Sequence, residues 1–159
     1  MKTASIFLAA AGFLCTAPLC AAEKPQQLPP ERLANYWLLA DTGNANVPNS
    51  GTNLHAPSCA AVSYVVEKDG STSNVKLEKI VPEGDLRKVA VSVVGAMRFT
   101  AAKQNVGKTP VATYVVIPFN LPDATSQVPA ERTERARILA QCQLDGYGPK
   151  PNEQVIRVK

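Results

Sequence analysis

Few residues in this chain have side chains that could do chemistry, and the cysteines are the most informative of them. Cys15 and Cys20 fall in the first 22 residues, whereas Cys59 and Cys142 lie in the remainder. An even pair of cysteines in an exported chain is typical of a disulfide. We therefore predict a Cys59–Cys142 disulfide, which would stabilise the fold by up to about 4.5 kcal/mol in the chain-entropy model. The alternative is two unrelated buried thiols.

The single histidine, His55, offers little support for catalysis. It lies in a loop rich in Asn, Gly, Ser and Pro, and the cysteines do not stand at metal-ligand spacing from it. A Cys59–His55 nucleophile pair would need Cys59 to be free, which the predicted disulfide excludes. There is no phosphate-binding loop and no cluster of carboxylates on one predicted face. We expect no enzymatic activity, no catalytic residue, no metal, no cofactor and no small-molecule substrate.

The first 22 residues have the three-part pattern of a secretory signal peptide. Lys2 supplies the positive start, residues 6–14 are apolar, and small residues end the segment at Ala21 and Ala22. We predict export and cleavage after Ala22 or one residue earlier, which places the mature chain in an oxidising compartment. The alternative is an uncleaved anchor over residues 4–22, whose length is marginal for crossing a bilayer.

Composition and charge describe an ordinary globular chain of one domain with extensions. The 159 residues are 45% hydrophobic and 19% charged, with a formal net charge of +4. A charge this small is far from that of a nucleic-acid-binding domain. We divide the chain into the signal peptide 1–22, a leader and loop 23–57, a domain 58–122 and an extension 123–159. Within the leader, 23–30 reads as flexible, and the apolar cluster 33–40 should dock on the domain as one short helix or strand.

The domain begins with two strands joined by a tight turn. Residues 60–67 form an apolar run with Val62, Tyr64 and Val66 on one face, which predicts a strand in the middle of its sheet. The Asp-Gly turn at 68–71 is a strong hairpin signal. Residues 72–80 then alternate between apolar and polar, as in a strand with one solvated side.

A helix and a third strand complete the domain. Asp85 is the predicted N-cap of a helix whose apolar residues recur at helical spacing. That stripe consists of Leu86, Val89, Ala90, Val93, Val94 and Met97. Residues 111–121 form the third strand, and Pro118 should place it at a sheet edge because proline cannot donate to a ladder. The order predicts an α+β fold, a small antiparallel ββαβ sheet with one packed helix and a C-terminal helical extension at 130–144, followed by a short tail strand.

The third strand is the candidate interaction site. An exposed edge carries unpaired N–H and C=O groups, to which an extended segment of a partner protein can add. The alternative is that residues 154–159 cover this edge, and a homodimer through paired edges is a further possibility. The residues assigned to partner binding are Val111, Ala112, Thr113, Tyr114, Val115, Val116, Ile117 and Phe119.

Four segments in the same order resemble the C-terminal domain of the TonB energy-transducer family. Residues 62–70 (VSYVVEKDG) look like its first strand and turn, and 73–77 (SNVKL) like its second strand. Residues 96–102 (AMRFTAA) are similar to its helix end, and 115–121 (VVIPFNL) to its closing strand. The family pattern has Trp where Met97 stands and Pro where Ala101 stands.

The resemblance implies a periplasmic domain that binds a peptide of an outer-membrane transporter along its last strand. It also implies a part in TonB-dependent transport across a Gram-negative outer membrane. A transducer of this family has a membrane anchor and a long Pro-rich linker, whereas the linker here is at most residues 23–57. The alternatives are therefore a membrane-anchored transducer facing the periplasm, with the segment 4–22 retained, or a structural envelope protein whose edge is capped by its own chain.

Overall fold

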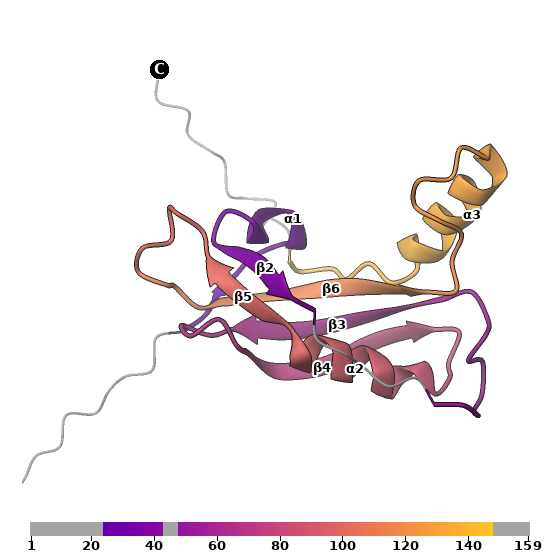
Figure 1. Ribbon diagram of the computed structural model, residues 1–159, viewed down its shortest axis with the longest axis horizontal. Helices are drawn as coiled ribbons and strands as arrows, with labels where there is room; N and C mark the ends of the chain where they lie inside the picture. The colour runs from indigo at the N-terminus through magenta and orange to yellow at the C-terminus, as the bar shows by residue number, and fades with distance from the viewer. Residues whose placement is uncertain (1–23, 43–47, 148–159) are drawn as a thin grey trace, which may run out of the picture.

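The computed structural model describes residues 24–42 and 48–147. The predicted signal peptide, its cleavage site and the expected tail strand lie outside these residues. Within the described chain, four strands form one sheet in the order β1-β6-β3-β4 and two strands form a second. Figure 1 shows the helix α2, Leu86–Ala96, in front of the larger sheet. The fold is α+β, and its core has the predicted ββαβ order.

The strand β3, Ser58–Val66, lies in the middle of the larger sheet. It pairs antiparallel with β4, Thr72–Val81, on one side and with β6, Val111–Phe119, on the other. Burial on both faces explains why its sequence has so few polar residues. Val62, Tyr64 and Val66 face one core cluster, as predicted, and Cys59 and Ala61 face a second on the opposite side.

The helix α2 packs its predicted apolar stripe on the first face of the sheet. Leu86, Val89, Ala90 and Val94 are buried there, so packing compensates for the modest helix propensity of the valines. Asp85 stands at the predicted N-cap position, but its side chain makes no capping hydrogen bond to the helix. Its Oδ2 atom instead accepts the backbone N–H of Thr52 at 2.8 Å and holds the preceding loop.

The second sheet is a two-stranded ribbon that no local sequence pattern predicts. The strand β2, Trp37–Asp41, pairs antiparallel with β5, Arg98–Ala101. The cluster 33–40 is therefore not one element, since the short helix α1, Pro30–Leu33, ends before β2 begins. Trp37 docks on the core as expected: it is buried, and its Nε1 donates a hydrogen bond to the Thr109 carbonyl at 2.9 Å.

The leader segment 23–30 is not a flexible stretch over its described part. Residues Gln26–Gln27 form β1, which runs parallel to β6 at Val111 and Ala112. The side chain of Leu28 is 3% exposed and belongs to the first core cluster. A single buried leucine therefore anchors a segment whose composition otherwise resembles a linker.

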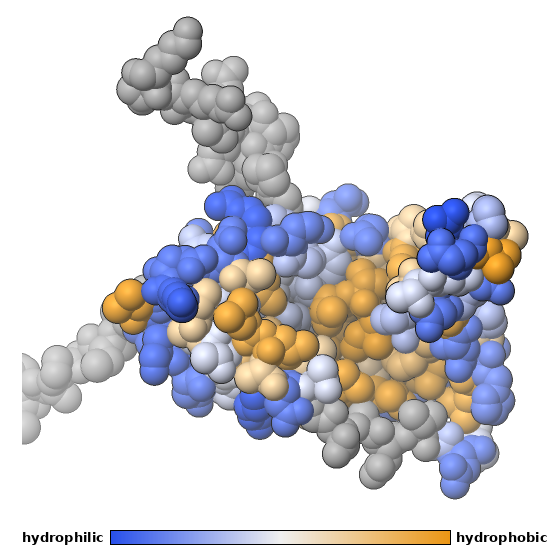
Figure 2. Space-filling model, turned by 45° about the horizontal axis from the view of Figure 1, so that its top comes forward, coloured by the Kyte–Doolittle hydropathy of each residue, from blue (hydrophilic) through white to orange (hydrophobic). Residues whose placement is uncertain are grey.

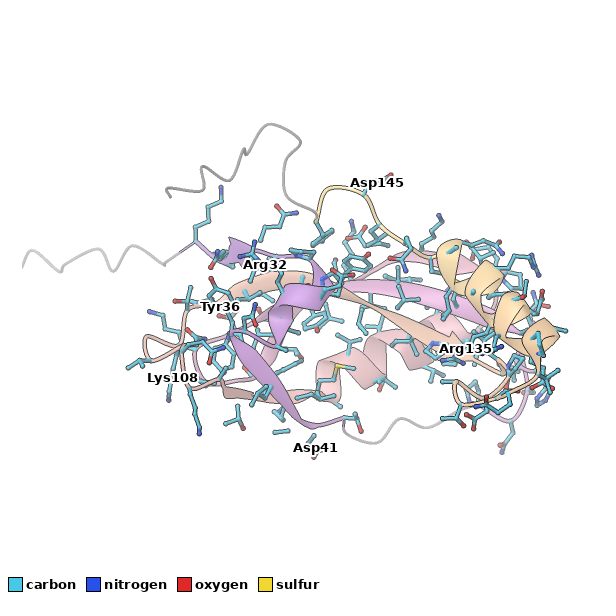
Figure 3. All side chains as sticks on the ribbon, turned by 90° about the horizontal axis from the view of Figure 1, so that it is seen from above. Arg32, Tyr36, Asp41, Lys108, Arg135 and Asp145 are labelled. Carbon is cyan, nitrogen blue, oxygen red and sulfur yellow. A yellow bond between two sulfur atoms is a disulfide. The ribbon has the colours of Figure 1, made fainter. Side chains whose placement is uncertain are left out.

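The C-terminal extension covers part of the opposite face of the sheet. The helix α3 spans Pro129–Ala140 and is shorter than predicted, since the chain leaves it at Gln141. Cys59 and Cys142 form the predicted disulfide and belong to the second core cluster with Ile138. From above, α2 and the segment that carries the labelled Asp145 lie on opposite sides of the sheet (Figure 3). The sheet is thus covered on both faces, although only one packed helix was expected for the domain.

Across residues 24–42 and 48–147, no helix combines the length and the hydropathy that a membrane span needs.

Candidate functional site

The larger sheet has two outer edges, and β4 forms one of them. Its pairing with β3 shifts register twice, between Ala61 and Val62 and between Ser63 and Val65. The side chains of Lys76 and Glu78 form an ion pair at 3.0 Å beside these irregularities. The hydroxyl of Ser63, together with Lys76, lowers the pKa of Glu78 and keeps its carboxylate charged. Bulges and charges of this kind protect an edge from adding another strand.

At the other side of the sheet β1 is outermost, and beyond it the strand β6 forms the edge, with regular pairing to β3. Nine consecutive residues of β6 pair with β3 without a register shift. The carbonyls of Pro110 and Ala112 accept the N–H groups of Gln26 and Leu28, each at 2.9 Å, and therefore point away from β3. Because peptide groups alternate in direction along a strand, those of Tyr114, Val116 and Pro118 also point outward.

The segment β1 covers only the start of this edge. It pairs with Val111 and Ala112, so these two predicted partner-binding residues already have a neighbouring strand from the same chain. Beyond them, no strand of the described residues pairs with the outer side of β6. The free part runs from Tyr114 to Phe119, and we call it the open edge.

Pro118 explains why the open edge has a defined end. Its nitrogen lies at an outward position, where the missing N–H costs no bond to β3. Pro118 therefore lies where an edge strand tolerates proline, as predicted, although β1 pairs with the start of this strand. Along the open edge, a partner could receive N–H donors from Tyr114 and Val116 and carbonyl acceptors from these two residues and Pro118.

The side chains of the predicted site divide between the two faces of the sheet. Val111 and Thr113 are fully buried and serve the core. The side chains of Val115, Ile117 and Phe119 are half-buried against the first core cluster, and Val116 is half-buried against the second. Figure 2 shows apolar surface between α3 and the β2–β5 ribbon, on the face where β6 runs. A strand added here would therefore meet apolar surface on both of its sides.

One wall beside the open edge comes from the C-terminal extension. The Tyr114 hydroxyl donates to Oε1 of Gln143 at 2.8 Å, and its ring lies 4.9 Å from that of Tyr147. Gln27 of β1 donates from Nε2 to the Gly146 carbonyl at 3.2 Å. No pattern in the sequence predicts this wall, and the one local signal of it is Tyr147, an aromatic residue in a turn-rich stretch.

The described residues do not assemble a metal cluster. No group of three or more His, Cys, Asp or Glu side chains lies close enough to hold a metal ion in this part of the chain. His55 is exposed, and Cys59, which would have been its nucleophilic partner, is committed to the disulfide. The chemistry that the geometry offers is backbone hydrogen bonding along the open edge.

Comparisons with known proteins give structural similarity but no sequence match. No protein-family model matches the chain, and a search of the curated proteins finds no match. Among solved structures, a solution NMR structure of the Pseudomonas aeruginosa TonB CTD is similar over 55% of this chain and 88% of that chain. The two are 14% identical, with a TM-score of 0.40.

Proposed function

We propose that this chain is a periplasmic, TonB-like protein-binding module that takes up an extended segment of an outer-membrane or envelope protein along the open edge. The observation that carries the proposal is the row of outward peptide groups from Tyr114 to Pro118. These groups lie on an uncharged, regularly paired strand, whereas the β4 edge is bulged and charged. Main-chain hydrogen bonds to such a row give affinity, and the apolar flanks select the side chains of the partner.

The location and the biological context belong to the same proposal. The signal-like leader and the Cys59–Cys142 disulfide support export to an oxidising compartment. The segments that resemble the TonB family support the periplasm and a link to TonB-dependent transport. The module acts by binding, not as an enzyme.

Substitution at Val116 tests the open edge directly. Val116→Pro removes an outward N–H and should weaken binding of a synthetic peptide, copied from the periplasmic recognition segment of a TonB-dependent transporter, by about tenfold. Loss of one or two hydrogen bonds at about 0.5–1.5 kcal/mol each gives this magnitude. Val116→Ala shortens the same side chain but keeps the N–H, so it is the matched control. Binding that is equal in the two variants would refute strand addition here.

Hydrogen exchange supplies the second measurement. Bound peptide should slow exchange of the Tyr114 and Val116 amides and leave the amides of β4 unchanged. Protection of the β4 amides alone would place the binding site at the β4 edge and overturn the proposal.

A self-capped structural protein is the second candidate, and the pairing of β1 with the start of β6 favours it. In that case, deletion of residues 154–159 should speed exchange of the Tyr114 and Val116 amides without any added partner. Unchanged exchange after the deletion would leave the open edge free for a partner.

A further inference from the structure

A groove separate from the open edge lies between α2 and the outer strand β4. Its volume is about 490 Å³, within the range of small-molecule sites. Leu77 of β4 and Val91 of α2 supply aliphatic surface, and Ser92 is the polar residue beside Val91. Arg87 and Lys88 supply the remaining lining and bring two positive charges to one end of an open apolar groove.

The helix presents this lining on a face that the core does not use. Arg87 and Val91 are one turn apart, as are Lys88 and Ser92, so the four form a stripe along α2. The residues of α2 that are buried in the core lie on another face, at Leu86, Val89, Ala90 and Val94. Val91 therefore adds apolar surface to the groove without belonging to the buried core.

The two cations stand where the helix itself disfavours them. Arg87 and Lys88 occupy the first turn of α2, and the macrodipole favours anions there. Arg87 contacts Glu83 at 2.5 Å, but both side chains are more than half exposed, and such a pair contributes little to stability. Within the described residues no ion pair holds Lys88, and the nearby Asp85 carboxylate is engaged by Thr52. An anion at this end of the groove would complement both charges.

We propose that the groove binds a single-chain anionic amphiphile, with its carboxylate beside Arg87 and Lys88 and its alkyl chain along Leu77 and Val91. The bulges and charges of β4 oppose a peptide that would need backbone pairing, so the groove suits a ligand without such a need. Its apolar surface and cationic end match an alkyl chain with one charged head. The ligand binds without reacting, and the site is independent of the open edge.

Decanoate is the probe, with decanol and decylammonium as uncharged and cationic counterparts of the same chain length. Decanoate is titrated into the full chain and amide NMR signals are recorded. The signals of Tyr114 and Val116 should stay in place, and those of the groove residues should shift: Leu77, Arg87, Lys88, Val91 and Ser92. Octanoate should bind more weakly than decanoate, by up to about fourfold for each methylene lost. Decanol that binds as tightly as decanoate, or shifts spread over the whole surface, would overturn the proposal.

A charge-matched pair of variants isolates the cationic end. Arg87→Gln with Lys88→Gln should weaken decanoate binding by about tenfold, as expected for two exposed charge contacts. Lys103→Gln with Lys108→Gln removes the same net charge from an exposed loop elsewhere and should leave binding unchanged. Val91→Ser should also weaken binding, while the fluorescence of buried Trp37 reports that the fold persists. If both double variants lost the same decanoate affinity, the loss would come from the net charge of the protein, and the proposed site would be refuted.

Two other occupants of the groove are distinguishable in the same experiment. Concentration-dependent shifts of the groove residues without ligand would assign the surface to a second copy of the chain. An acidic, leucine-containing peptide that binds more tightly than decanoate would assign it to a protein partner. Either result would overturn the amphiphile proposal.

Discussion

Loss of the Cys59–Cys142 disulfide should cost this protein a large share of its stability. The bond closes a loop of 83 residues in sequence separation. In the chain-entropy model, a loop of this length restricts the unfolded chain by about 4.5 kcal/mol at 25 °C. The total stability of a domain is typically about 5–15 kcal/mol, so the reduced protein should unfold at a much lower urea concentration.

The fluorescence of Trp37 measures this effect away from the bond itself. Trp37 is the single tryptophan and lies in the first core cluster, whereas both cysteines lie in the second, across the sheet. Urea titrations of the oxidised and the reduced full chain should give unfolding free energies that differ by about 2–4.5 kcal/mol. The reduced chain should have the lower urea midpoint. The reduced protein keeps both sulfur atoms, so this comparison isolates the bond from the packing of the side chains.

The double variant Cys59→Ala, Cys142→Ala provides the control. It should be at least as destabilised as the reduced protein, because both positions are fully buried and lose a sulfur atom. A second probe, amide exchange at Ile138, reports on the extension. If reduction released Ile138 while the Trp37 transition moved by less than about 1 kcal/mol, the extension would unfold independently. That result would refute the claim that the bond stabilises the whole domain.

Three further predictions concern the core and its hairpin. Trp37→Ala should destabilise the fold by about 3–5 kcal/mol in urea titrations followed by circular dichroism, because it empties a buried site and removes the bond to Thr109; a loss below 1 kcal/mol would contradict this. Gly70→Ala should lower the thermal midpoint, because φ is +83° and a Cβ would lie 2.0 Å from the carbonyl oxygen of Phe99, and an unchanged midpoint would disprove that close approach. Burial raises the pKa of Tyr64 to about 12 from 10.0, so the unfolded chain loses this proton first and stability should fall by up to about 3 kcal/mol between pH 10 and 12. Stability is unaffected by this group below pH 10, and Tyr64→Phe should remove its share of the alkaline loss; an identical pH profile in the variant would count against it.

Local sequence patterns were sufficient to predict the strands, the turn and the helix at the centre of the fold. Alternation from Val62 to Val66, the Asp-Gly turn and the stripe of α2 each depend on neighbours within a few residues. Each of them indicates which side chains face the core before any long-range contact is known. The disulfide followed from counting, since the predicted cleavage of the signal peptide would leave Cys59 and Cys142 as the one cysteine pair.

The pairing of strands that are far apart in the chain could not be predicted from the sequence. The joining of β2 with β5, and of β1 with β6, brings together segments that are far apart in the chain, and neither segment has a strong strand pattern. Leu28 appears in the sequence as one leucine among prolines and glutamines, and only the folded core gives it a buried position. Short strands of this kind depend on the surface that receives them, because their own propensities are too weak.

At the candidate site, too, one part could be predicted from the sequence and another was decided by the tertiary structure. Pro118 alone indicated that residues 111–121 form an edge, because a missing N–H is tolerated where no strand pairs. The extent of the free edge was decided by the tertiary structure, which places β1 against Val111 and Ala112 and leaves Tyr114 to Phe119 open. Hydrogen-bonding capacity is fixed by residue type, whereas its availability depends on which other segment of the chain packs beside it.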